Sequence, residues 1–270
     1  SLVMRRAMEY ALAFDVPVVD HCEDLHLAEG GCMNEGAIST ELGLPGMPSA
    51  AEDVMVARNV ALAELTGARL HLAHISTEGS ARMVREAKSR GLKVTAEACP
   101  HHFTITEETV RGYNTYAKMN PPLRTWKDVQ AIKEGLRDGT IDVIATDHAP
   151  HATQEKQLGF AEAPFGIVGL ETALPLTFAL VDEGVLSLES AVDKLSTAPA
   201  KVFGLAKGTL AVGADADVTI VAQQEQWEVD PAKFFSKSRN TPFAGWKVKG
   251  RVRTTIVGGR VVFEASQAEG

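Results

Sequence analysis

The sequence is poor in cysteine and aromatic residues, and it has no long hydrophobic run. Its three cysteines, Cys22, Cys32 and Cys99, show no paired spacing, which argues against a disulfide scaffold and favours a reducing compartment such as the cytoplasm. No apolar stretch approaches the roughly 18–20 residues of a membrane span, and no signal-peptide pattern is visible. A net charge of -8 argues against nucleic acid or an anionic membrane as the main partner.

The 270 residues alternate short β-branched runs with amphipathic helical patterns. This alternation predicts an α/β fold of parallel strands with helices outside. The spacing of Ser49 and Glu52 predicts a capping box, and Thr125 and Gly139 are expected to bound another helix. The strands are expected at 16–21, 70–75, 93–98 and 141–146, and the helices at 4–14, 49–66, 79–90, 125–138, 169–183 and 187–203.

The pattern changes near residue 205, which suggests a domain boundary between residues 1–204 and 205–270. Three further strands are expected at 218–222, 252–257 and 261–263. The dipeptide Gly258-Gly259 between the last two predicts a hairpin turn. The second region is therefore expected to be a small antiparallel appendage.

Polar residues occur at or near the ends of the four predicted parallel strands: His21, His74, Glu97 and Asp147. In a (β/α)8 barrel, catalytic groups converge at this end. Two histidines and one aspartate would suit Zn²⁺, although hydrogen-bonded polar groups at a barrel rim are the alternative. Strand alternation is expected to place His71 on the face opposite to His74.

Three other segments carry candidate residues. His101 and His102 are adjacent, and on a strand end they would point in opposite directions, so loop packing is favoured over metal binding. Asn120 lies in the proline-stiffened segment Lys118–Arg124, where its amide could read a substrate amide, unless the segment is a simple connector. The glycine of Ala163–Gly166 would let the backbone approach a ligand, unless it only makes a turn.

Taken together, these motifs resemble those of the dihydroorotases of the amidohydrolase superfamily, most of all the bacterial class I type. The resemblance implies a (β/α)8 barrel with a small β-sandwich. It also implies the reversible interconversion of N-carbamoyl-L-aspartate and L-dihydroorotate in pyrimidine synthesis. The matching segments occur in the family order: Val19–Asp24, Ala73–Thr77, Lys118–Arg124, Ala145–His151 followed by Lys156, and Asn240–Phe243.

The resemblance also implies roles for single residues. His21 and His74 resemble the metal ligands of the fifth and sixth barrel strands, in a site for one or two zinc ions. Asp147 resembles the eighth-strand aspartate, which is both a metal ligand and the catalytic proton shuttle.

The resemblance implies a second set of residues that contact the substrate. Asn120 and His151 belong to this set through their side chains. Phe165 and Gly166 belong to it through their backbone.

The family's first motif, Asp-x-His-x-His, is absent from the sequence, which contains no His-x-His. We therefore expect strands five to eight of the barrel, its C-terminal half, with part of the sandwich. A missing N-terminal segment or a partner chain would then complete the site. A homo-oligomer is expected, with aspartate transcarbamoylase as a possible partner.

Two rival functions remain open. A hydantoinase, dihydropyrimidinase or allantoinase would share the barrel and much of the metal site, but the spacing of Asp147, His151 and Lys156 favours a dihydroorotase. An inactive dihydroorotase-like subunit that scaffolds aspartate transcarbamoylase would explain the absent first motif. The presence of His21, His74 and Asp147 argues against it.

Overall fold

The computed structural model describes residues 1–265, and its centre is a four-stranded parallel sheet in the order β1-β4-β5-β6. Each strand is paired in parallel with its neighbour, as the strand–helix alternation predicts. The strands are shorter than expected, and β6 has only two residues. Their bounds are Val18–His21 (β1), Leu70–Ala73 (β4), Val94–Ala98 (β5) and Val143–Ile144 (β6).

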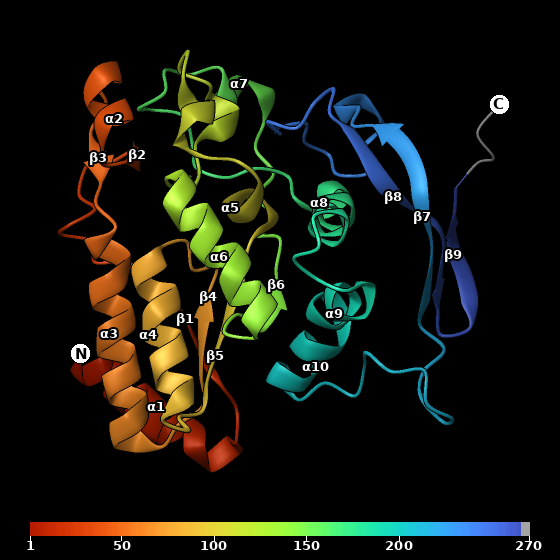
Figure 1. Ribbon diagram of the computed structural model, residues 1–270, viewed down its shortest axis with the longest axis horizontal. Helices are drawn as coiled ribbons and strands as arrows, with labels where there is room; N and C mark the ends of the chain where they lie inside the picture. Colours follow the sequence, from red (N-terminus) through yellow and green to blue (C-terminus); the bar gives the residue numbers. More distant parts are fainter. Residues whose placement is uncertain (266–270) are drawn as a thin grey trace.

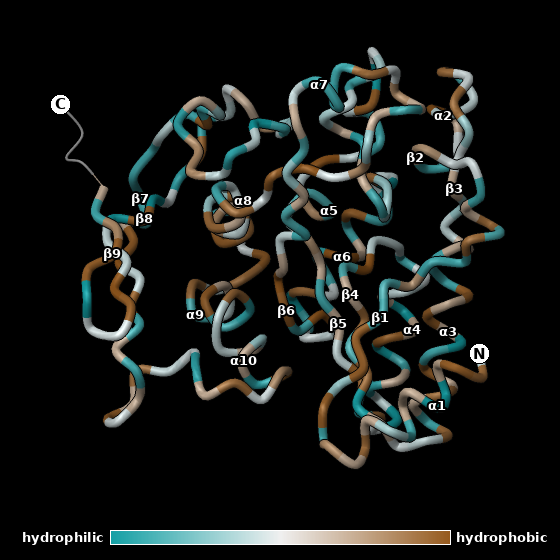
Figure 2. Tube along the Cα trace, turned by 180° about the vertical axis from the view of Figure 1, so that it is seen from behind, coloured by the Kyte–Doolittle hydropathy of each residue, from teal (hydrophilic) through white to brown (hydrophobic). Residues whose placement is uncertain are grey.

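Helices α3, α4 and α6 cover one face of this sheet (Figure 1), and in the reverse view the strands lie in front of them (Figure 2). The predicted helix at 187–203 is divided into two α-helices by a π-helical segment, Asp193–Thr197. The helices are α1 (Leu2–Ala11), α2 (Ala37–Leu42), α3 (Ala50–Thr66), α4 (Glu78–Ser89), α5 (Pro100–Thr104), α6 (Trp126–Asp138), α7 (Thr153–Lys156), α8 (Leu170–Asp182), α9 (Leu188–Val192) and α10 (Ala198–Phe203).

The helix-start signals gave one correct and one wrong prediction. Thr125 and Asp128 form the reciprocal capping box at the start of α6, and Gly139 ends this helix in the left-handed conformation. The capping box predicted at Ser49 is wrong, because the Ser49 side chain makes no cap hydrogen bond. Glu52 instead turns into the core, where its carboxylate accepts a hydrogen bond from the Ser76 N–H at 2.9 Å.

The two faces of the parallel sheet differ in chemistry. Val19, His71 and Thr95 are in register across β1, β4 and β5, so their side chains share one face. This is the face away from α3 and α4, and Val19 is 49% exposed on it. Leu72, on the helix-covered face, is fully buried. His71 and Thr95 therefore lie on the face that α3 and α4 do not cover, which we call the open face, whereas Asp20 binds Arg58 and Asn59 of α3 on the other face.

A second, antiparallel sheet of order β7-β8-β9 packs against α8 (Figure 1). Its strands are β7 (Val218–Glu228), β8 (Lys247–Val257) and β9 (Arg260–Glu264). Gly258 and Gly259 both have positive φ between β8 and β9, which confirms the hairpin. A short parallel pair, β2 (Met33–Asn34) and β3 (Gly46–Met47), lies before α3. In residues 1–265, no helix is long and apolar enough to cross a membrane.

Candidate functional site

His21 and His74 meet at the carboxyl ends of neighbouring strands. His21 is the last residue of β1, and its register partner in β4 is Ala73. His74 directly follows Ala73. The His21 Nδ1 and His74 Nε2 atoms are 3.1 Å apart, and the ring centroids are 4.7 Å apart. The strand order therefore brings together two imidazoles that are 53 residues apart in the sequence.

The prediction that strand alternation places His71 and His74 on opposite faces is wrong, because it assumes that both residues belong to the strand. His74 has φ of +33°, so it lies outside the strand and strand alternation does not extend to it. His71 lies on the open face, where its Nδ1 contacts Thr95 Oγ1 at 2.8 Å and its Nε2 contacts Glu97 Oε2 at 3.0 Å. His71 is thus a fully buried, hydrogen-bonded residue beneath the site.

Glu97 supports His74 directly. Its Oε1 accepts a hydrogen bond from the backbone N–H of His74 at 3.3 Å, while its Oε2 holds His71. The two oxygens thus link a buried histidine to the strained backbone of the candidate ligand. Sequence reasoning placed Glu97 at a strand end but assigned it no role.

Glu23 is a site residue that sequence reasoning missed. Its Oε2 accepts a hydrogen bond from Asn120 Nδ2 at 2.9 Å and lies 2.9 Å from His21 Nε2. Because a carboxylate only accepts, His21 Nε2 carries the proton and Nδ1 of the neutral ring keeps its lone pair. The available signal was the position of Glu23, two residues after a histidine that ends a strand.

Asp147 lies after β6 with φ of +46°, and its side chain is exposed. Burial lowers the pKa of His74, the neighbouring His21 lowers it further, and the charges of Asp147 and Glu97 act against this. The donor atoms of His21, His74 and Asp147 do not all lie within 4.8 Å of one another.

The His21–His74 pair fits a metal ion. Two nitrogens bound to one Zn²⁺ at about 2.0–2.1 Å with tetrahedral angles lie roughly 3.3–3.4 Å apart, close to the separation in this pair. The observed separation is 3.1 Å. Glu23 accepts from His21 Nε2, which leaves the lone pair of His21 Nδ1 free for an ion. Donor chemistry and spacing both suit one shared cation.

Three of the four expected substrate contacts, His151, Phe165 and Gly166, come together around Asn240. His151 donates its backbone N–H to Asn240 Oδ1 at 3.2 Å, and its ring Nε2 contacts the Phe165 carbonyl at 2.7 Å. Asn240 Nδ2 donates to the carbonyls of Ala149 at 2.9 Å and Gly166 at 3.2 Å. Asn240 thus connects the segment after β6 to the Phe165–Gly166 turn.

The backbone of this turn is already engaged within the protein. The Gly166 N–H donates to the Lys118 carbonyl at 2.8 Å, and the Phe165 carbonyl is held by His151. Gly166 has φ of +106°, and a Cβ there would lie 2.4 Å from Ala149 Cβ. Only glycine fits at this position. Backbone contacts to a substrate would need these groups to exchange partners.

Two buried lysines fix the same region. Lys156 Nζ donates to the carbonyls of Thr115 at 3.1 Å and Pro164 at 2.7 Å. Burial, with a smaller effect of the charge on Lys118, lowers the pKa of Lys156 to about 8. Lys118 Nζ donates to the Ala161 carbonyl at 2.8 Å and lies 4.5 Å from the centroid of the Phe165 ring. Both ammonium groups therefore hold loop carbonyls beside the turn.

The Asn120 segment is anchored by a buried ion pair between Arg124 and Glu52, with 3.7 Å between nitrogen and oxygen. Arg124 also donates to Ser76 Oγ at 3.1 Å and to Asn34 Oδ1 at 2.8 Å. Burial acts to raise the pKa of Glu52, but Arg124 and the Ser76 hydrogen bonds outweigh it and lower the pKa. The segment is thus a supported part of the site.

His101 and His102 do not lie at a strand end. They are in helix α5, both are buried, and their ring centroids are 4.3 Å apart. The alternation argument therefore does not apply to them. Within residues 1–265, Cys99, His101 and His102 are the one group of three cysteine, histidine or carboxylate side chains whose donor atoms lie within 4.8 Å of one another.

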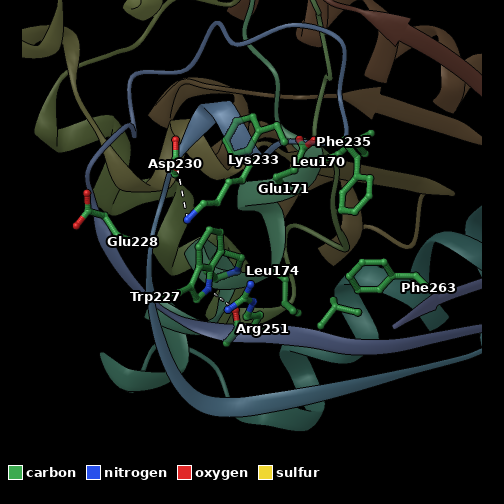
Figure 3. A pocket seen from close by; sticks show the side chains of 14 residues that line it. Leu170, Glu171, Leu174, Trp227, Glu228, Asp230, Lys233, Phe235, Arg251 and Phe263 are labelled. Atoms are coloured by element: carbon green, nitrogen blue, oxygen red, sulfur yellow. Dashed lines mark hydrogen bonds and ion pairs between the residues drawn. The ribbon is translucent and has the colours of Figure 1, made fainter. Parts of the chain in front are cut away.

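A cavity of about 650 Å³ lies elsewhere, between α8 and the small sheet (Figure 3). Leu170 and Leu174 from α8 line one side, and Trp227, Phe235 and Phe263 surround the rest. Its lining holds no histidine or cysteine. This cavity therefore lacks the imidazole ligands that distinguish the site at the strand ends.

Comparisons with known proteins show the family to which the sequence is related. The model of the amidohydrolase family matches residues 3–262. The dihydroorotase of Syntrophus aciditrophicus is 56% identical to this chain, and that of Geobacter sp. strain M21 is 58% identical. Each match covers 98% of this chain and 62% of the relative. The chain thus spans 62% of the length of these relatives.

Solved structures give the same fold. The dihydropyrimidinase of Brevibacillus agri matches with a TM-score of 0.86 and 27% identity, over 98% of this chain and 60% of that one. The L-hydantoinase of Arthrobacter aurescens matches with a TM-score of 0.87 and 30% identity, over the same shares.

Proposed function

The chain belongs to the amidohydrolase family, and from this we propose that its site serves the reversible interconversion of N-carbamoyl-L-aspartate and L-dihydroorotate. The observation that carries the proposal is the pair of imidazole nitrogens 3.1 Å apart at the carboxyl ends of neighbouring strands. The dihydroorotase relatives favour this cyclic amide over others.

His21 Nδ1, His74 Nε2 and Asp147 would hold a metal ion, which we propose to be zinc, as one or two ions. When bound, the metal would polarise the amide carbonyl and lower the pKa of water, so that hydroxide is available to attack the carbonyl carbon. Two imidazoles and one carboxylate are a partial ligand set for such a site. We propose that further ligands come from protein beyond these 270 residues, on another segment or another chain.

Asp147 is proposed as the proton carrier. In ring opening, its carboxylate takes a proton from the attacking water and gives it to the ring nitrogen as the amide C–N bond breaks. In ring closure, the protonated carboxyl returns that proton. Its exposed side chain at the end of the open sheet face leaves room for this exchange.

Asn120 and His151 are proposed to position the substrate. The Asn120 amide would read the ring amide, and Glu23 already fixes its orientation. His151 would bind the substrate carboxylate, supported by Asn240 on its backbone. The backbone of Phe165 and Gly166 is proposed to complete this pocket, once its internal hydrogen bonds have exchanged.

The architecture around the site is proposed to be strands five to eight of a (β/α)8 barrel, in residues 1–204. The open sheet face and the helices on the other face support this. Residues 205–270 are proposed as part of a small β-sandwich domain, of which 266–270 lie outside the described residues. A homo-oligomer, association with aspartate transcarbamoylase and a cytoplasmic location stay predictions.

A substrate comparison tests the proposal. Together with the segment or chain that supplies the further ligands, the protein should turn over L-dihydroorotate, with far slower hydrolysis of dihydrouracil, hydantoin and allantoin under the same metal load. The structural likeness to hydantoinases makes these the right competitors. Faster hydrolysis of hydantoin or dihydrouracil would overturn it. If the protein binds no metal, shows no turnover and co-purifies with a transcarbamoylase, these results would support the alternative of an inactive subunit that scaffolds aspartate transcarbamoylase.

A further inference from the structure

Cys99, His101 and His102 form a compact buried cluster at the start of α5. Cys99 is the N-cap residue of this short helix, and the two histidines lie in its first turn. Their exposed fractions are 0%, 4% and 3%. Their donor atoms lie within 4.8 Å of one another. The proposed substrate chemistry uses none of the three.

The hydrogen bonds of His102 leave one ring nitrogen available. His102 Nε2 lies 3.0 Å from the Pro121 carbonyl oxygen, which can only accept, so Nε2 carries the proton. Nδ1 therefore has the lone pair, and it is buried without a partner. Metal-binding histidines commonly donate their other ring N–H to a backbone carbonyl in this way.

We propose that Cys99, His101 and His102 bind a monovalent thiophilic cation of the Cu⁺ class. Thiolate and imidazole are the ligands that soft cations select. One thiolate, two neutral imidazoles and one monovalent cation have no net charge. Burying such a group therefore costs less free energy than burying a divalent ion with the same ligands.

Binding is a proton exchange without electron transfer. The Cys99 thiol loses its proton, the S–Cu bond forms, and one proton leaves for each ion bound. Donor atoms bound at about 2.0–2.3 Å lie roughly 3.3–3.8 Å from one another. The three donor atoms lie within 4.8 Å of one another, so they need to converge by at most about 1.0–1.5 Å, a shift within side-chain rotation.

Anaerobic titration with Cu⁺ against a chromophoric chelator tests the site, in protein whose other metal sites are filled with zinc. The wild-type protein should hold one more equivalent of Cu⁺ than the Cys99→Ser variant. Cys32→Ser is the matched control, because Cys32 is also buried and lies against only a backbone carbonyl, that of Pro45 at 3.5 Å. This variant should bind as much Cu⁺ as the wild type.

X-ray absorption on Cu⁺-loaded wild-type protein provides a readout that needs no variant. It should show one sulfur and two imidazole nitrogens around each copper. Equal uptake by wild type and folded Cys99→Ser would overturn the proposal, as would copper bound by sulfur alone. If Cys99→Ser does not fold, judged by circular dichroism, the absorption spectrum decides.

Discussion

Glu23 lies between His21 and Asn120, with one carboxylate oxygen 2.9 Å from a nitrogen of each. One acidic side chain thus sets the tautomer of a proposed metal ligand and the orientation of a proposed substrate-binding amide. The strand end and the proline-stiffened segment are 97 residues apart in the sequence. Their coupling through Glu23 makes metal affinity and substrate binding sensitive to the same residue.

Replacing Glu23 by glutamine should weaken zinc binding by about 10–100-fold, because the neutral amide oxygen accepts the hydrogen bond from His21 more weakly than the carboxylate does. Zinc competition with a chelator measures the change. Glu29→Gln is the control, because Glu29 is exposed and lies in the same segment. Equal zinc affinity in the Glu23→Gln variant and the wild type would contradict this role.

Replacing Glu97 by alanine should lower the free energy of unfolding by about 1–3 kcal/mol, because His71 is left buried without its carboxylate partner. The backbone N–H of His74 loses its acceptor in the same change. Urea denaturation measures the loss. A stability change within about 0.5 kcal/mol, the range of ordinary surface substitutions, would show that the Glu97 contacts do not stabilise the fold.

The buried Lys156 should make stability rise with pH above about 8. Burial lowers its pKa in the folded protein to about 8 from the ordinary value of 10.5, so between these values the unfolded chain binds more protons. The stability contribution of Lys156 therefore increases through this window, and the cost of its burial is full below pH 8.

Urea denaturation of wild type and Lys156→Gln at pH 7.5 and pH 9.5 isolates this effect. The difference in unfolding free energy, wild type minus variant, should grow with pH. A difference that is constant, or that falls with pH, would refute the assignment to Lys156.

Thr125→Ala should destabilise the protein by about 1 kcal/mol, because the capping hydrogen bonds of α6 are lost. Ser49→Ala, at the start of α3, should cost less than about 0.5 kcal/mol, because the Ser49 side chain makes no cap. Thermal or urea denaturation of the two variants makes the comparison. Equal losses would show that the two termini are capped alike.

The sequence predicted those parts of the fold that depend on local signals. The Thr125–Gly139 helix and the Gly258-Gly259 hairpin are both confirmed, because their residues act on neighbours in the chain. Side-chain direction at the strand ends was not predictable in this way. His74 and Asp147 take positive φ just beyond their strands, where the period of two no longer applies.

The supporting residues of the site depend on tertiary contacts. Glu52 has the spacing of a capping residue, but it binds Ser76 and Arg124, which come from distant segments. Asn240 stands about 90 residues from its partners, His151 and Ala149. No local pattern encodes such contacts, so only the fold shows them.

The most direct test of the account measures bound zinc and dihydroorotate turnover together, in His21→Ala, His74→Ala and Asp147→Asn variants. His26→Ala serves as the control, because His26 is an exposed neighbour of the site. We predict that the two histidine variants lose zinc. We also predict that Asp147→Asn loses about 10²–10⁴-fold in turnover, the range for a lost general acid–base. Unchanged zinc content and turnover in all three variants would contradict the proposed site.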